Sequence, residues 1–202
     1  NIGTLTVEFV EAMKLAAKAA NRKGIPVILD VCGAGATPLR DQKVKELLSQ
    51  GKINIMKGNA SEIARVAGES VTTKGVDAGD VQGDITTMAK SLAAKKRCVV
   101  VVTGKEDIVT DGKKTCLVRN GDPMMTNIVG TGCMATSAIG TFAAVEKDLV
   151  FAATSGLVCF EIAAECAAKT SKGPASFKEK LFDCLFGLDE KTINKAQKVH
   201  SS

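Results

Sequence analysis

The sequence of 202 residues contains no tryptophan, no tyrosine and a single histidine, His200, near its C-terminal end. Binding of single-stranded nucleic acid depends on aromatic side chains that stack on bases, so the lack of Trp and Tyr weighs against it. With only His200 available, histidine-based catalytic triads and histidine-based zinc sites are improbable. The lysine-bearing phosphate loop G-x-x-x-x-G-K-[ST] is absent as well, which excludes the P-loop enzymes.

Charge and hydrophobic content are those of an ordinary globular protein. The chain is 45% hydrophobic and 24% charged, with a formal net charge of +5, and much of the positive excess follows Lys169. We interpret the C-terminal lysines as a solvated basic tail and expect no nucleic-acid partner. We recognise no signal peptide and no uninterrupted apolar run long enough to cross a bilayer, and therefore expect no membrane partner.

The chain has seven cysteines, but no two have the short spacing of a zinc site or a redox motif. We interpret them as free thiols in a reducing compartment, six of them small core residues, which predicts a cytoplasmic protein. The first residue is Asn1 rather than methionine. We therefore expect the sequence to begin after processing or inside a longer parent.

Short apolar runs alternate with helical patterns along the chain. Helices are expected over residues 6–24, 37–51, 59–67 and around 85–92. Strands are expected over residues 26–30, 53–56 and 97–103, and the polar stretch 69–83 is expected to be a loop. Asp111-Gly112 predicts a hairpin between two further strands. Beyond Met125 the chain should be helical, with breaks at 172–174 and 187–189.

This order of elements predicts one domain over residues 1–202, of the α/β class. The sheet should be central and mainly parallel, flanked by helices, with a β-hairpin at one edge. In such sheets ligands bind beyond the carboxyl ends of the strands. Four loops should share one crevice there, namely residues 30–33, 57–62, 103–107 and 129–133.

The loop from Gly130 to Cys133 (GTGC) opens an Ala-rich helix. Its glycines allow backbone N–H groups to turn outward, and the helix start adds about half a positive charge, which suits a phosphate or a developing alkoxide. Cys133 at that position should have partial thiolate character. The alternative is a tight turn in which Cys133 is a small buried hydrophobe.

Acidic and basic residues follow two of the expected strands. Asn59 and Glu62 have the spacing of a capping box, which is the commoner reason for that pattern. The functional alternative places Glu62 beside a divalent cation that faces nucleotide phosphates. Lys57 could pair with a phosphate as a point charge, and Asp30 could hold Mg²⁺ through water or anchor a loop.

Segments in consistent order from end to end resemble the hydroxyethylthiazole kinase family, thiamine-salvage enzymes of the ribokinase-like superfamily. The matching segments are residues 1–5 (NIGTL), 30–38 (DVCGAGATP), 57–62 (KGNASE), 102–104 (VTG), 109–112 (VTDG), 121–125 (GDPMM), 130–133 (GTGC) and 182–190 (FDCLFGLDE). The resemblance implies transfer of the γ-phosphoryl group of ATP, with Mg²⁺, to the primary hydroxyl of 4-methyl-5-(2-hydroxyethyl)thiazole.

The resemblance also implies roles for single residues. Lys57 and Thr103 match the family's ATP-contacting residues, and we add Asp30 and Gly132 to the cofactor-binding set. Gly130 matches a substrate-contacting glycine.

The same resemblance implies the metal and the base. Glu62 matches the metal-associated acid of the family's N-x-x-E motif, and we add Asp30, the acid at the end of the first expected strand, to the metal set. Cys133 stands where most ribokinase-like enzymes carry a catalytic Asp, and Cys is what this family uses there. A homotrimer with sites between subunits is implied as well.

Three departures from the family pattern bear on activity. Lys57 replaces the usual Arg, and Val31 replaces the Pro that commonly follows the Asp. The sequence also begins without the family's N-terminal segment, which closes over the thiazole.

Alternative functions are a hydroxymethylpyrimidine kinase, the kinase half of a fusion with thiamine-phosphate synthase, and an inactive nucleotide-binding module. The pyrimidine kinases usually keep Asp where Cys133 stands. The intact Glu62, Thr103 and residues 130–133 argue against the inactive module.

Overall fold

The computed structural model describes residues 1–68 and 78–201, with the backbone alone for 78–83. Three helices are capped by the polar residues with which the expected helical ranges 6–24, 37–51 and 59–67 begin. The Thr6 hydroxyl caps α1 (Val7–Arg22), that of Thr37 caps α2 (Pro38–Gln50), and the Asn59 side chain caps α3 (Ala60–Ala67). In each case the side-chain oxygen accepts a hydrogen bond from a backbone N–H group of the first turn.

Six strands form one mixed sheet in the order β1 to β6. They are β1 (Ile28–Asp30), β2 (Ile55–Asn59), β3 (Val99–Thr103), β4 (Asp107–Thr110), β5 (Thr115–Val118) and β6 (Val199–Ser201). Pairing is parallel from β1 to β3 and antiparallel from β3 to β6. The predicted α/β class is confirmed, and so is the hairpin, β4–β5, but β6 pairs with β5 and takes the place at the edge. The expectation of a mainly parallel sheet is wrong, because β4, β5 and β6 all add in antiparallel pairing and only β1, β2 and β3 pair in parallel.

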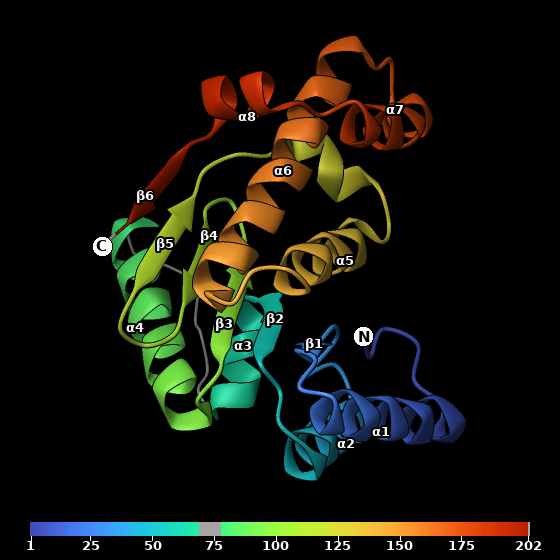
Figure 1. The fold of residues 1–202 in the computed structure, drawn as a ribbon, viewed down its shortest axis with the longest axis vertical. Coiled ribbons are helices and arrows are strands. Elements are labelled where there is room, and N and C mark those ends of the chain that lie inside the picture. The colour runs from blue at the N-terminus through green and yellow to red at the C-terminus, as the bar shows by residue number, and fades with distance from the viewer. Residues whose placement is uncertain (69–77, 202) are drawn as a thin grey trace.

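Helices cover both faces of the sheet (Figure 1). On one face α3 and α4 (Ala78–Lys96) pack against β2 and β3, and on the other α5 (Thr131–Ala143) and α6 (Leu149–Thr170) pack against β1 and β5. A short 3-10 helix, η1 (Pro123–Asn127), precedes α5. The loop predicted over 69–83 is wrong for residues 78–83, which are the first turns of α4, whereas residues 69–77 lie outside the described part.

The expectation of a solvated basic tail after Lys169 is wrong. That part of the chain forms α7 (Pro174–Phe186), α8 (Glu190–Ala196) and β6. Phe177 and Leu181 of α7 are buried in the same cluster as Phe160 of α6. The lysines lie on the outer surface of a folded segment, because its apolar residues anchor it to the core.

Helix α6 is the core helix of this fold. By length and composition it could cross a membrane, but 72% of its apolar window is buried inside the protein. Burial against α5, α7 and the sheet accounts for its composition without a lipid environment.

The crossing of α5 and α6 depends on Gly156. A Cβ at this position would lie 2.7 Å from the Cα of Ile139 and 2.8 Å from its backbone N, so the helices would have to separate. We expect Gly156→Ala to lower the free energy of unfolding by about 2 kcal/mol in urea denaturation.

Gly140→Ala is the matched control for that substitution. Its Cβ would meet only the Ile28 Cδ1 atom, at an ordinary 3.6 Å. The control should gain up to about 1 kcal/mol from the higher helix propensity of alanine. Equal stability of the two variants would contradict the close crossing.

Candidate active site

The ends of β1 and β2 meet the start of α5 through one lysine. The Lys57 Nζ atom lies 3.3 Å from Asp30 Oδ2 and donates a hydrogen bond to the Gly132 carbonyl oxygen at 3.0 Å. Lys57 is 4% exposed and Asp30 is 1% exposed. A Cβ at position 132 would lie 2.9 Å from this ammonium group, so a glycine permits the approach. The sequence prediction that these loops share one region is confirmed for this part.

Asp30 is only partly satisfied. Its Oδ2 atom accepts a hydrogen bond of 2.7 Å from the Thr136 hydroxyl, whereas Oδ1 is buried without a partner among the described residues. Sequence reasoning missed Thr136. The available signal was its spacing, since Thr136 follows Gly132 by one helical turn and therefore lies on the same face of α5.

Glu62 joins two loops. Its Oε2 atom accepts a hydrogen bond from the Asn59 N–H group at 2.8 Å, which completes the capping box, and its Oε1 atom accepts one from the Gly33 N–H group at 2.7 Å. The capping interpretation is therefore confirmed. Both oxygens of this carboxylate also fix the loop that follows β1 against the start of α3.

The end of β3 lies beside the same region. The Thr103 hydroxyl donates a hydrogen bond of 3.4 Å to the Gly58 carbonyl oxygen. The turn after Thr103 is held by Asp107, whose Oδ1 atom accepts a hydrogen bond from the Gly104 N–H group at 2.9 Å. Thr103 thus stands next to the loop of β2, as the sequence predicts.

A buried carboxyl pair supports this turn, and sequence reasoning missed it. Asp107 is 4% exposed and interacts with Glu161 of α6, which is 5% exposed. Burial, and then the charge of Asp107, raise the pKa of Glu161 to about 11. Glu161 is therefore protonated at neutral pH and donates its proton in a hydrogen bond to Asp107.

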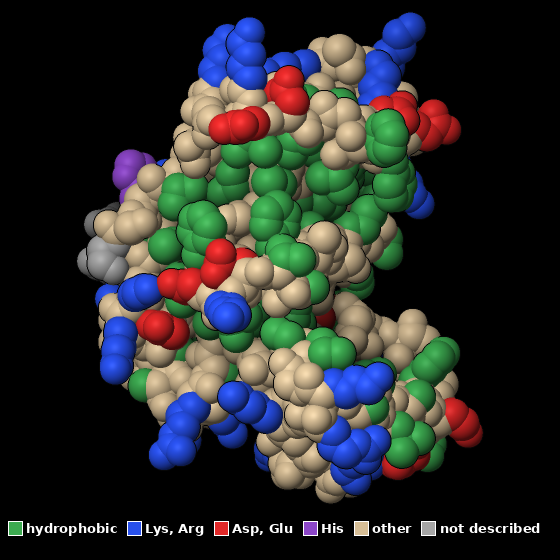
Figure 2. All heavy atoms as spheres, in the orientation of Figure 1, with side chains coloured by type: hydrophobic (Ala, Val, Ile, Leu, Met, Phe, Trp, Pro, Cys, Tyr) green, Lys and Arg blue, Asp and Glu red, His purple; other side chains and the backbone are tan. Residues whose placement is uncertain are grey.

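Cys133 lies in the first turn of α5 and is exposed. Gly130 precedes this turn at a φ of 98°, a conformation that favours glycine. No side chain in the described part of the chain caps this helix start. The surface is hollowed between α5 and the part formed by α1 and β1 (Figure 2). The alternative interpretation of Cys133 as a small buried hydrophobe is therefore wrong.

The other cysteines follow the core expectation only in part. All seven thiols are free, but only Cys98 and Cys159 are buried. Burial raises the pKa of Cys98 to about 11. The remaining four are half-buried, at positions 32, 116, 166 and 184.

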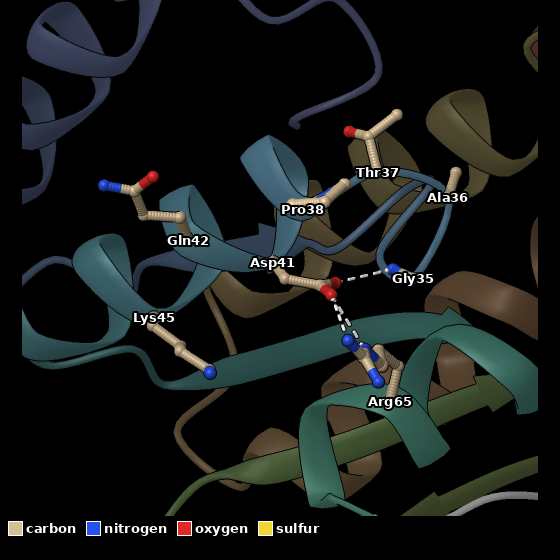
Figure 3. A pocket seen from close by; sticks show the side chains of 8 residues that line it. All are labelled: Gly35, Ala36, Thr37, Pro38, Asp41, Gln42, Lys45 and Arg65. Atoms are coloured by element: carbon tan, nitrogen blue, oxygen red, sulfur yellow. Dashed lines mark hydrogen bonds and ion pairs between the residues drawn. The ribbon is translucent and has the colours of Figure 1, made fainter.

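A separate cavity of about 470 Å³ lies between α2 and α3 (Figure 3). Asp41 and Arg65 both line this cavity and form an ion pair, with Asp41 Oδ2 2.6 Å from Arg65 Nη2. Asp41 Oδ1 accepts a hydrogen bond from the Gly35 N–H group at 2.8 Å. The hydrogen bond from Arg65 lowers the pKa of Asp41. These contacts brace the loop after β1 from behind.

The acidic, histidine and cysteine side chains available as ligands determine which kind of metal site this protein can form. Among the side chains that the structure describes (residues 1–68 and 84–201), no three or more His, Cys, Asp or Glu form a metal-binding group. A Mg²⁺ ion that accompanies a nucleotide needs only one or two carboxylates, because phosphates and water supply the other ligands. The unpartnered Oδ1 of Asp30 fits this second kind of site.

Comparison with known proteins gives consistent results for sequence and structure. The model of the hydroxyethylthiazole kinase family matches residues 1–191. A curated hydroxyethylthiazole kinase from Methanosarcina mazei is 48% identical over 199 residues, which are 98% of this chain and 76% of that protein. The solved hydroxyethylthiazole kinase of Pyrococcus horikoshii superposes with a TM-score of 0.90 at 38% identity, over 100% of this chain and 75% of that one.

A more distant structure shares the fold. The pyridoxal kinase of Staphylococcus aureus, solved with AMP-PCP and pyridoxal, has a TM-score of 0.57 at 14% identity. The match covers 96% of this chain and 68% of that one. The ribokinase-like architecture expected from the sequence is therefore confirmed.

Proposed function

Because this chain belongs to the hydroxyethylthiazole kinase family and is thus a phosphotransferase of thiamine metabolism, we propose that it phosphorylates the thiazole alcohol where Asp30, Lys57 and α5 meet. The observation that carries this assignment is the buried Lys57 ammonium, which contacts both Asp30 and the first turn of α5. It supports an anion site at the helix start, next to the exposed thiol of Cys133.

Phosphoryl transfer needs mostly positioning and neutralisation of charge. Lys57 fixes the α5 start through Gly132 and places a positive charge beneath it. The backbone N–H groups of that turn then donate to the oxygens of the transferred phosphoryl group. Cys133 Sγ accepts the proton of the substrate hydroxyl, and Gly130 lets the chain approach the substrate closely.

ATP is the proposed donor, and Mg²⁺ its accompanying ion. Thr103 contacts the nucleotide at the end of β3. Asp30 and Glu62 hold the ion through water, and when bound it neutralises charge on the phosphates. Glu62 already accepts two backbone hydrogen bonds, so it serves best as an indirect ligand.

The assembly and location of the protein are also proposals. We infer a cytoplasmic homotrimer with sites between subunits, in which residues 1–202 form one domain. Free thiols support a reducing compartment. Strongly exposed apolar side chains, such as Val129 (98%), Val145 (85%) and Phe186 (95%), support contact between subunits.

A comparison of two acceptors tests the substrate assignment. The full chain is incubated with Mg-ATP and either hydroxyethylthiazole or hydroxymethylpyrimidine, and the rate of ADP release gives kcat/KM for each. We expect a preference for the thiazole of at least about 100-fold. A preference for the pyrimidine would assign the other vitamin kinase, and no turnover with either would leave a nucleotide-binding module.

Substitution of Cys133 tests its role as the base. Cys133→Asp should keep or raise kcat, because a carboxylate also accepts a proton, whereas Cys133→Ser should lower kcat about 100-fold. Steady-state rates at saturating ATP measure both variants. Equal rates for wild type, Asp and Ser would show that Cys133 is not the base.

A further inference from the structure

The side chain of Asn1, the first residue of this sequence, contacts the sulfur of Cys133. The Asn1 Nδ2 atom donates a hydrogen bond to Cys133 Sγ at 3.2 Å, across 132 residues of sequence. An amide can point either end at a neighbour, but here the orientation is fixed. The Gly3 N–H group donates to Asn1 Oδ1 at 2.7 Å, so the N–H end of the amide faces the sulfur.

The backbone that carries Asn1 is firmly held. Ile2 is 0% exposed, and its N–H group donates to the Asp30 carbonyl oxygen at 3.2 Å. The Arg40 guanidinium donates to the carbonyl oxygens of Ile2 and Gly3, and also to that of Cys32 at 3.1 Å. A Cβ at Gly3 would lie 2.8 Å from Asn1 Oδ1, so the glycine makes room for the folded-back amide.

We propose that Asn1 is a positioning residue, whose amide N–H group holds the Cys133 sulfur in the orientation in which it accepts the substrate proton. The inference rests on the proposed function, since it treats Cys133 as the proton acceptor. A hydrogen bond to the sulfur restricts its rotamers, because the donor amide is itself held in place. Asn1 acts only through the sulfur and needs no contact with substrate.

The sharpest variant is Asn1→Asp. It keeps the size of the side chain and the acceptor for the Gly3 N–H group, but it replaces the donor that faces the sulfur with a carboxylate oxygen. The sulfur then faces a negatively charged oxygen in place of a hydrogen-bond donor. Thr4→Asp is the matched control, because Thr4 is exposed on the same segment and the substitution adds the same charge.

Two readouts follow the sulfur and the reaction separately. Alkylation of Cys133 by iodoacetamide at neutral pH, quantified on the Cys133 peptide by mass spectrometry, should slow about tenfold in Asn1→Asp and less than about twofold in Thr4→Asp. The kcat for thiazole phosphorylation should fall about tenfold in Asn1→Asp, with an unchanged KM for ATP.

Unchanged alkylation in Asn1→Asp would overturn the inference, and so would equal slowing in both Asp variants. Failure of the proposed function looks different. In that case the wild type makes no thiazole phosphate, while the alkylation rates still decide whether Asn1 controls the thiol.

Discussion

Lys57→Met is expected to destabilise the fold and to remove most of the activity. The substitution leaves the Asp30 carboxylate, 1% exposed, with Thr136 as its remaining side-chain partner. Breaking a buried ion pair by removing one partner costs about 3–5 kcal/mol, which urea unfolding at neutral pH measures directly. The α5 start also loses its contact through Gly132, so kcat/KM should fall by about two orders of magnitude.

Two further variants distinguish the effect of the unpaired Asp30 charge on stability from the effect of the lost Lys57 packing. Lys57→Met combined with Asp30→Asn removes both charges, and it should recover at least about 2 kcal/mol of the loss. Lys57→Arg keeps the positive charge and should lose less stability than Lys57→Met. Equal losses in Lys57→Met and in the double variant would show that the unpaired Asp30 charge is not the cause.

Glu161→Gln is expected to stabilise the protein above about pH 5. The pKa of Glu161 is raised from 4.5 to about 11 in the folded state, so folding favours the protonated form. Its contribution to stability is fully present below pH 4.5 and is lost progressively as the pH rises toward 11. The loss amounts to about 1.4 kcal/mol per pH unit for one proton.

Glutamine keeps an N–H donor for Asp107 and does not titrate. The free energy of unfolding of Glu161→Gln, relative to wild type, should therefore rise steadily as the pH increases from about 5 to about 8. Urea titrations at several pH values measure this slope. Glu179→Gln, at an exposed position of α7, is the control and should track wild type. Parallel curves for Glu161→Gln and wild type would contradict the shared proton.

Local features of this fold are readable from the sequence. Thr6, Thr37 and Asn59 cap helices because their side chains reach N–H groups only two or three residues away. The meeting of Asp30 and Lys57 follows from topology, since carboxyl ends of neighbouring parallel strands lie at one edge.

Contacts between segments that are far apart in the sequence could not be predicted from the sequence pattern. Strand β6 is three residues long, and its register is set by pairing with β5 rather than by its own pattern. A glutamate in a helix is usually exposed to solvent, but Glu161 is buried in the core and interacts there with Asp107 of β4. The contact of Asn1 with Cys133 likewise depends on the packing of two segments that are 132 residues apart in the sequence.

The roles proposed for Lys57 and Cys133 depend on transfer of a phosphoryl group from ATP to the thiazole alcohol by this chain. The most direct test is ³¹P NMR of the wild-type chain with Mg-ATP and hydroxyethylthiazole. We expect a new phosphomonoester resonance that grows in step with ADP, as phosphoryl transfer to an alcohol requires. ADP that appears with inorganic phosphate and without the ester, or no ADP at all, would contradict it.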